Sequence, residues 1–540
     1  MSDLADLAKS SVRGSFFLFL GEFSSTIIMA LASILIAVFL GPEEYGIYTI
    51  VFIVPSLLVE LSDLGVSPAL TRFSAHYQAE GKNRKVANLV KTGILFKFTF
   101  SLILSLSMLL LAEGIATNVL KRPAIGFLIR LASLNLIGEA LLNSVNSVFI
   151  GLDKAELSGL LKFIQAIIKA VVSPLLLLLG LGVAGATLGA GLGLAFAAAT
   201  GVILIVFRTC PMLERNSYRG KNINFSQALK KMISYGTPLY FSAIIGTVLL
   251  QYRTILLTLF TSNTDIGYYA IVMNFSVLMN VLTYPLSTSL FPSFSKLKIE
   301  KNRNEIGNML KLAVKYVSLI IIPASLALAV LSSDVVPTLY GSQYTTASRY
   351  LCLYSLSLLY TGMGMFVIGP LINSQGDTKT TLRIGIVGFA VSIPLSSLLT
   401  PLYGVLGLIT SILISQLIST SYSLYIVHQR YELDIEPSYS LKILAASLLS
   451  ALLVYLFSKL ITLTNPIYSL ACGGVLYTTS FLLFAPILGA ITDEDIENLK
   501  YATNELPIIR ILAANILKIE KKILNLKVLL PTRHARAHEE

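Results

Sequence analysis

Charged side chains within long apolar stretches are the residues of this sequence best suited to chemistry. Arg253 lies in the stretch 232–260, and Lys169, Glu139 and Glu60 lie in three others. An ionisable group deep in a bilayer costs about 2.5–3.5 kcal/mol on insertion scales, so each needs a partner, water or a bound ligand. A guanidinium can hold phosphate oxygens through two parallel hydrogen bonds, and a buried carboxylate can hold a proton or a sodium ion. The pattern therefore indicates a site for ions inside the membrane.

The candidate site residues divide by charge. The basic candidates for substrate contact are Arg253, Lys169 and Arg130, and the acidic candidates for a coupling ion or a cavity wall are Glu22, Glu60, Asp63 and Glu139. Each keeps a structural alternative, which is an ion pair or a hydrogen-bonded acid within a helix bundle. Lys169, for example, could pair with Glu139, and Arg253 could extend to the outer interface.

Local sequence places three of the acids on helices. Glu60 and Asp63 are three residues apart, so they share one helix face. The stretch SDLG at 62–65 interrupts the apolar run, which puts Asp63 near a helix break. Glu22 is flanked by Gly21 and by two serines, and small side chains of this kind allow helices to approach closely.

Motifs for catalysis and metal binding do not stand out. The four histidines lie in loops or in the C-terminal tail, and Cys210, Cys352 and Cys472 are far apart with no CxxC spacing. We find no HExxH, GxSxG or phosphate-binding glycine loop. We therefore expect no catalytic residue, no cofactor and no metal site, although scattered carboxylates are enough for some membrane glycosyltransferases.

Composition indicates a polytopic all-α membrane protein. Of the 540 residues, 55% are hydrophobic and 13% are charged, whereas soluble domains carry about 25% charged residues. The apolar runs are long enough to cross a hydrocarbon core of about 30 Å. We predict about fourteen transmembrane helices, near 11–40, 46–72, 92–112, 124–150, 157–179, 183–207, 232–260, 267–292, 308–331, 346–373, 381–400, 404–427, 440–462 and 466–489. The chain from Ile491 onward is charged and helix-like, and we expect it in water.

An internal repeat organises these spans. The phrase AVFLGPEEYGIYTIV at 37–51 returns as LFTSNTDIGYYAIV at 259–272, with Gly46 matching Gly267 and Tyr48 matching Tyr269 at a shift of 221 residues. The same shift places Ala32 on Arg253, so this charge breaks the repeat. A unit of six spans gives a parallel repeat. The predicted domains are two six-helix lobes at 1–210 and 211–430, two accessory helices at 431–490 and a tail at 491–540.

Loop charges predict the orientation in the membrane. Basic residues gather in alternate loops, whereas the opposite loops are mostly acidic: the basic set includes Lys82, Arg84, Lys85, Arg208, Arg215, Lys230, Lys296, Lys298 and Lys379, and the acidic set Glu43, Glu44, Asp265 and Asp334. By the positive-inside rule both termini are cytoplasmic. This distribution also accounts for the net charge of +12 without a nucleic-acid partner.

The phrases LGPEEYGIYTIV, SDLG and GYYAIV resemble the polysaccharide-biosynthesis flippases, which move lipid-linked oligosaccharides and share a superfamily with multidrug extruders and the lipid II flippase. The resemblance covers about residues 8–489. It implies two six-helix lobes around a central cavity, two accessory helices and alternating access.

We therefore expect a flippase of the cell membrane that moves a lipid-linked glycan to the external leaflet, with membrane lipids and a coupling cation as further partners. Two alternatives stay open. One is a cation-coupled multidrug exporter of the same fold, and the other is an integral membrane glycosyltransferase or ligase.

Overall fold

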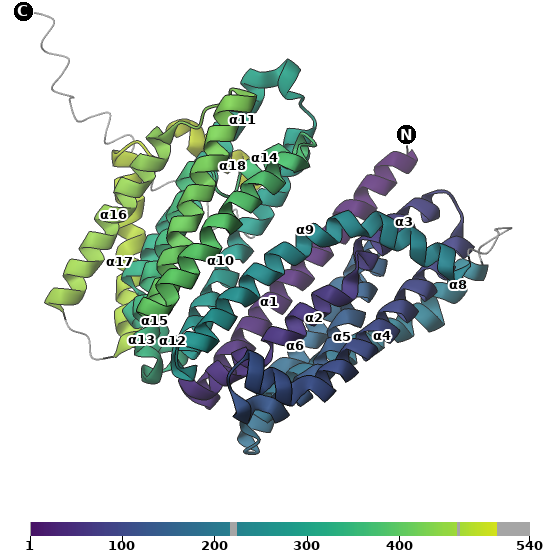
Figure 1. The fold of residues 1–540 in the computed structure, drawn as a ribbon. Helices are drawn as coiled ribbons and strands as arrows, with labels where there is room; N and C mark the ends of the chain where they lie inside the picture. The colour runs from purple at the N-terminus through teal and green to yellow at the C-terminus, as the bar shows by residue number, and fades with distance from the viewer. Residues whose placement is uncertain (1, 216–223, 462–464, 505–540) are drawn as a thin grey trace, which may run out of the picture. The chain divides into compact units, whose positions relative to one another are not determined.

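A computed structural model describes residues 2–215, 224–461 and 465–504, and Figure 1 shows its fold. Over these residues all regular elements are helices, which confirms the all-α class. The chain forms two compact units. Unit 1 is Met1–Val281 with Ser396–Leu408, and unit 2 is Leu282–Leu395 with Ile409–Glu540. The lobes predicted from the repeat have other boundaries, at 210, 430 and 490, and these stay a prediction.

Unit 1 is a bundle in which α1 packs on α6, α5 packs on α4 and α7, and α9 packs on α2, α3 and α4. Its helices are α1 Ser2–Val51, α2 Ile53–Asp63, α3 Val66–Ala79, α4 Asn83–Gly114, η1 Ile115–Val119, η2 Pro123–Ile125, α5 Gly126–Gly151, α6 Ala155–Leu178, α7 Gly182–Leu204, η3 Ile205–Thr209, α8 Cys210–Arg215, α9 Phe225–Phe260 and the first part of α10, Asn263–Ser295.

Unit 2 is a second bundle, in which α11 packs on α13 and α16, and α17 packs on α12 and α16. Its helices are the end of α10, α11 Ile299–Val330, α12 Ser332–Tyr340, η4 Ser342–Tyr344, α13 Thr345–Ser355, η5 Leu356–Met363, α14 Ile368–Ser374, most of α15 Thr378–Tyr431, α16 Pro437–Leu460, α17 Pro466–Ile487 and α18 Asp493–Asn504.

The described residues contain nine helical segments that are long and apolar enough to span a membrane, or ten if one bent pair is included. The chain is therefore a multi-pass membrane protein. Two of these segments, Gly21–Asp63 and Thr378–Tyr431, have 43 and 54 residues. At 1.5 Å per residue they measure about 65 and about 80 Å, too long for one crossing. The first overlaps two of the predicted spans and the second contains two, but the count of fourteen stays a prediction.

Glycines divide both of these long segments. Gly41 has φ 74° and ψ 172°, and Gly404 has φ 56° and ψ −133°. Positive φ is costly for residues with a Cβ atom, so glycine at these two positions lets the chain kink between two helical stretches. Gly182 of GVAG (182–185) matches Gly404 of GVLG (404–407) at a shift of 222 residues, and it also has positive φ, 50°. The two matched glycines thus share a positive φ.

The matched glycines Gly46 and Gly267 lie against each other within unit 1. A Cβ atom on Gly46 would overlap the carbonyl oxygen of Asn263, and one on Gly267 would overlap the carbonyl oxygen of Pro42. Pro42 and Asn263 are separated by the same 221 residues as the two glycines, so the contact is reciprocal. The parallel repeat is therefore also a local symmetry of the packing.

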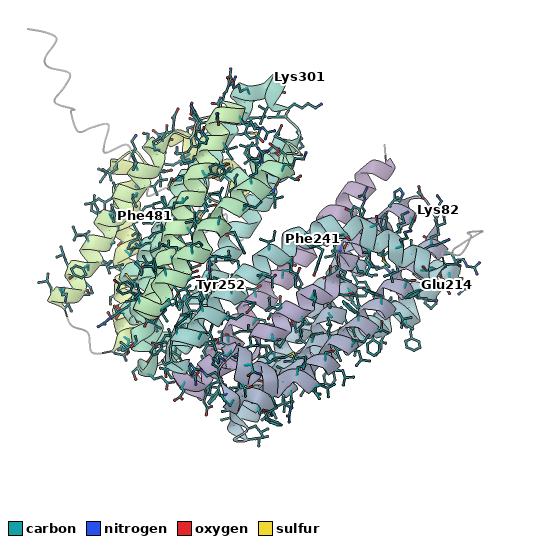
Figure 2. All side chains as sticks on the ribbon, viewed as in Figure 1. Lys82, Glu214, Phe241, Tyr252, Lys301 and Phe481 are labelled. Atoms are coloured by element: carbon teal, nitrogen blue, oxygen red, sulfur yellow. The ribbon has the colours of Figure 1, made fainter. Side chains whose placement is uncertain are left out.

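Basic loops of the predicted cytoplasmic set gather at one end of unit 1. Lys82 and Glu214 lie at this end (Figure 2), and Lys91 forms a 2.6 Å ion pair with Glu214. The loop before α4 and the short helix α8 therefore share one side of the bundle, as the alternating charges predict.

The start of the C-terminal tail forms the helix α18, in keeping with its helix-like sequence, and one side of it packs on unit 2. Ile491 and Ile496 are buried among side chains of α11, α16 and α17. Asp495 is also buried and accepts a 2.5 Å hydrogen bond from the Lys315 ammonium of α11. Apolar contacts and a buried ion pair thus attach this part of the tail to unit 2, while Asp493, Glu494, Glu497 and Lys500 are exposed. Residues 505–540 lie outside the described part of the chain.

Candidate functional site

The helix break after Asp63 positions the first part of the candidate site. Leu64 and Gly65 adopt left-handed backbone conformations, so α2 ends at Asp63 and α3 begins at Val66. Asp63 accepts hydrogen bonds from the backbone N–H and the hydroxyl of Ser67, which bridges the break. The SDLG sequence thus interrupts the second span, as expected, and leaves a carboxylate at the interruption.

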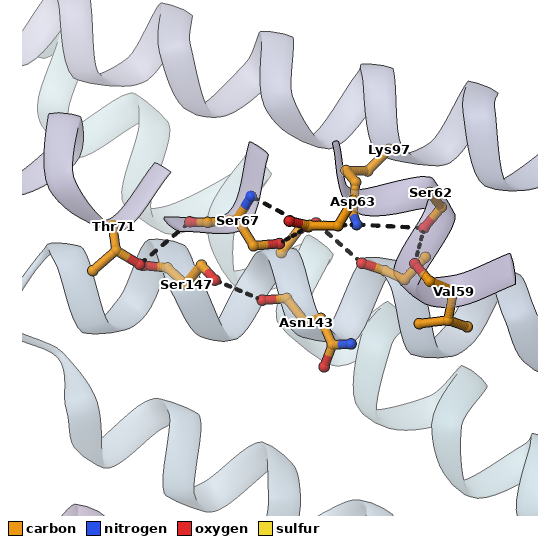
Figure 3. A network of polar contacts seen from close by, with 10 residues as sticks. Val59, Ser62, Asp63, Ser67, Thr71, Lys97, Asn143 and Ser147 are labelled. Atoms are coloured by element: carbon orange, nitrogen blue, oxygen red, sulfur yellow. Dashed lines mark hydrogen bonds and ion pairs between the residues drawn. The ribbon is translucent and has the colours of Figure 1, made fainter. Parts of the chain in front are cut away.

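Asp63 forms an ion pair with Lys97 of α4. The Lys97 ammonium lies 2.8 Å from Asp63 Oδ1 and 3.4 Å from the Ser62 hydroxyl, as the close-up in Figure 3 shows. The Lys97 side chain is 1% exposed and that of Asp63 is 18% exposed. Burial of two charges is costly unless their hydrogen-bonding capacity is filled. This pair combines the ion pair with bonds to Ser62 and Ser67.

The pair borders a polar cavity of about 370 Å³ within unit 1. We call it the polar cavity, and its lining is Val59, Glu60, Asp63, Ser67, Pro68, Lys97, Asn143, Asn146, Ser147, Ile150, Lys162 and Tyr240. Glu60 lies close enough to Asp63 and Lys97 for electrostatic interaction. The cavity thus places charges of both signs among membrane-spanning helices.

Glu22 joins the same region through Lys162. The Lys162 ammonium lies 2.5 Å from Glu22 Oε1, and both side chains are partly exposed. The pair links α1 to α6. Close to it a Cβ atom on Gly21 would lie 2.7 Å from Gly159 Cα, so the two helices approach closely through glycines, as the small side chains around Glu22 predict. Neither Lys162 nor Lys97 is among the site residues predicted from the sequence. The signal for both was a lone lysine in an apolar stretch.

Glu139 and Lys169 are near each other but do not form an ion pair in the described structure. They are close enough for electrostatic interaction, and Lys169 also interacts with Tyr45. Tyr45 belongs to a buried cluster, because its hydroxyl lies 2.8 Å from the Ser33 hydroxyl and accepts a 2.9 Å hydrogen bond from Asn274 Nδ2. Through Asn274 this cluster connects the first copy of the repeat, α1, to the second copy, α10.

The two arginine candidates lie elsewhere. Arg253 is half-buried in α9, next to Tyr252, whose hydroxyl lies 2.5 Å from the Ser397 hydroxyl of α15 (Figure 2). Arg130 forms a 2.8 Å ion pair with Glu113, with 47% and 59% of the side chains exposed. Neither arginine is among the residues that line the polar cavity. The structure therefore gives Arg130 a local partner, and its contact with a substrate stays a prediction.

The charges brought together at the polar cavity and beside it are thus the pairs Asp63–Lys97 and Glu22–Lys162, with Glu60 beside the first. Ammonium groups bind phosphate oxygens, and carboxylates that lose an ammonium partner take up a cation. In this arrangement each ammonium can exchange its internal carboxylate partner for a negative charge on a bound molecule.

Sequence comparisons give relatives with short or distant matches. A probable low-salt glycan biosynthesis flippase, Agl15 of Haloferax volcanii, is 18% identical over 270 residues, which are 49% of this chain and 57% of that protein. A probable lipid II flippase, MurJ of Vibrio cholerae, is 26% identical over 22% of this chain and 24% of that protein. The succinoglycan biosynthesis transport protein ExoT of Rhizobium meliloti is 22% identical over 60% of this chain and 61% of that protein. The matches thus span about a quarter to three-fifths of these relatives.

Solved structures share the fold. A lipid II flippase MurJ in an inward closed conformation matches with a TM-score of 0.69 at 18% identity, over 87% of this chain and 98% of that one. An inward-facing multidrug resistance transporter of the MATE family matches with a TM-score of 0.65 at 15% identity, over 75% of this chain and 94% of that one. At such identities these matches show the polytopic helical fold.

A family model described as "Polysaccharide biosynthesis protein" matches residues 35–349. This match covers more than half of the 540 residues and includes α2 to α12. The matched range contains the polar cavity, the contact between Gly46 and Gly267, and Arg253. The chain therefore belongs to the polysaccharide biosynthesis protein family.

Proposed function

We propose that the protein is a flippase that moves a lipid-linked oligosaccharide from the cytoplasmic to the external leaflet of the cell membrane. The observation that carries the proposal is the polar cavity among spanning helices, with the ammonium groups of Lys97 and Lys162 on its lining. A glycan and its phosphates cannot cross hydrocarbon without such a lining. The family and the names of the relatives support the same substrate class.

The proposed mechanism is an exchange of counter-ions. Without substrate, Lys97 and Lys162 are neutralised by Asp63 and Glu22. A phosphate that binds either ammonium weakens that internal pair, and the carboxylate set free then favours a proton or a sodium ion. Binding of the anionic lipid and of a coupling cation are thereby linked. Glu60, beside the first pair, adds a second acid to the same step.

Arg253 supplies a different contact in this proposal. It is half-buried in the seventh predicted span, at a place where the first copy of the repeat has Ala32. Its planar guanidinium can bind two phosphate oxygens in parallel, a geometry that lysine lacks. We propose that it contacts the diphosphate while the lipid tail stays in the bilayer and the lobes alternate between the two sides. Both termini are cytoplasmic in this proposal.

The experiment measures translocation of a fluorescent polyprenyl-diphosphate-linked saccharide in vesicles with the reconstituted full-length protein. Arg253→Ala should lower the rate about ten- to a hundredfold, because one charge-assisted contact contributes about 1.5–3 kcal/mol. Arg253→Lys should restore little. The control is Arg349→Ala, which removes an exposed arginine from α13. Rates are divided by the amount of folded protein.

Two results would contradict the proposal. A wild-type rate for well-folded Arg253→Ala would remove Arg253 from the substrate site. Saccharide that stays on the original side while an organic cation is exported would favour the multidrug exporter instead. The acids of the polar cavity are the observation in favour of that second function, since carboxylates attract cationic drugs.

A further inference from the structure

A second cavity lies wholly within unit 2, between α11, α12 and α13 on one side and α16 and α17 on the other. Its volume is about 860 Å³, which is within the range of about 300–1,000 Å³ found for sites of small molecules. We call it the unit 2 groove. No residue of this groove lines the polar cavity, so it is separate from the proposed transport site.

The walls of the groove are apolar and continue onto the outer surface of α16. Leu326 and Val330 of α11 face the groove with Leu448 and Leu452 of α16. Leu448 and Leu452 are also exposed large hydrophobic side chains on a helix apolar enough to span the membrane. A molecule that enters along this wall comes from the lipid phase and must itself have an apolar part.

One end of the groove is polar and carries two opposite charges. Lys459 lies in the last turn of α16, with its ammonium 5.8 Å from the centre of the Tyr455 ring. Asp334 lies in the first turn of α12 and shares a hydrogen bond with the Ser469 hydroxyl of α17. Within the described residues no ion pair joins Lys459 to Asp334, although both line the groove. The two charges are therefore available to a ligand separately.

We propose that the unit 2 groove binds a zwitterionic phospholipid of the surrounding bilayer. An acyl chain lies along the leucines, the phosphate contacts Lys459, and the terminal ammonium of the headgroup contacts Asp334. Charge complementarity decides between lipids, because a diphosphate would place its negative charges beside one lysine and one aspartate. The bound lipid fills the space between the two accessory helices and α11, and so holds them together.

Cys352 makes the proposal directly measurable. It lines the groove and is a free thiol, and Cys472 is a free exposed thiol that does not line it. Full-length protein is stripped of lipid in detergent, titrated with phosphatidylethanolamine and pulsed with N-ethylmaleimide. Mass spectrometry of the peptides then gives the labelling rate at each cysteine. We expect phosphatidylethanolamine to slow labelling of Cys352 and to leave that of Cys472 unchanged.

Variants test the headgroup contacts. Lys459→Ala should raise the lipid concentration needed for protection about tenfold, the low end expected for loss of a charge-assisted contact, and Asp334→Asn should raise it as well. The matched control is Lys442→Ala, which removes an exposed lysine beside Tyr439 on the same helix, 5.5 Å from the ring centre. Lys442 does not line the groove.

Three outcomes would overturn the proposal. The first is equal labelling of Cys352 with and without phosphatidylethanolamine. The second is protection that is unchanged in both Lys459→Ala and Asp334→Asn. The third is protection by a polyprenyl diphosphate at lower concentration than by phosphatidylethanolamine, which would assign the groove to a lipid-linked substrate.

Discussion

Removal of Asp63 should destabilise the protein strongly, because it leaves a buried ammonium without its counter-ion. Lys97 is 1% exposed, and after Asp63→Ala its remaining described hydrogen-bond partner is the Ser62 hydroxyl at 3.4 Å, with only the electrostatic interaction with Glu60 left to offset its charge. Loss of one partner of a buried pair costs about 3–5 kcal/mol. We expect a cost in this range for Asp63→Ala.

Removal of Lys97 should cost less, for a reason visible in the same geometry. Asp63 is 18% exposed, borders the polar cavity and keeps its two hydrogen bonds from Ser67. Lys97→Met keeps much of the side-chain volume, so we expect a loss of about 1–3 kcal/mol. The double variant buries neither charge of the pair and should be more stable than Asp63→Ala alone. The coupling energy of the cycle should then be at least about 2 kcal/mol.

The assay follows the thiol of Cys210 as the purified protein is unfolded with sodium dodecyl sulfate. Cys210 is 1% exposed within the core of unit 1, so it reacts only when that core opens. The matched control is the exposed pair Arg130–Glu113, with the same separation of 2.8 Å, whose coupling energy should be about 0–1 kcal/mol. Additive effects of Asp63→Ala and Lys97→Met, each below about 0.5 kcal/mol, would refute the reasoning that this pair is desolvated.

Four further predictions follow from other parts of the chain. Burial alone would raise the pKa of Asp495, but hydrogen bonds from Lys315 and Thr492 hold it below its ordinary value. The stabilisation is therefore present above the unfolded pKa of about 3.9 and is lost as the pH falls, so acid should speed proteolysis within α18, and an unchanged rate would contradict this. A cysteine near Lys298 should be protected from an external impermeant reagent and one near Glu44 should react, with the reverse pattern excluding cytoplasmic termini. Leucine in place of Gly46 should lower the yield of folded protein on size-exclusion chromatography, since its Cβ atom would overlap a carbonyl oxygen; a normal yield would show that α1 and α10 can separate at no cost. Alanine in place of Pro394, which lies within α15, should slow transport more than it lowers stability, and an unchanged rate would make the proline a packing feature.

The sequence by itself determined the class, the repeat and the family. Apolar length fixes whether a helix can cross a bilayer, and the shift that matches Gly46 with Gly267 is a property of residue spacing alone. Helix length and residue spacing are both local features. The structure confirms the first in its apolar helical spans and the second in the reciprocal contact between Gly46 and Gly267. The sequence also predicts the helix break at Asp63, because SDLG interrupts an apolar run.

Only the tertiary structure decided which charges meet. Sequence suggested that Lys169 could pair with Glu139, whereas the ion pairs described at the polar cavity and beside it join Asp63 to Lys97 and Glu22 to Lys162. Pairing depends on which helices are neighbours, on their rotation and on their relative height, and none of these is encoded in the spacing along one helix. The same reason explains why Arg130 is found in an exposed ion pair. Ionisable residues in the spans could thus be identified from the sequence, but their partners required the packed bundle.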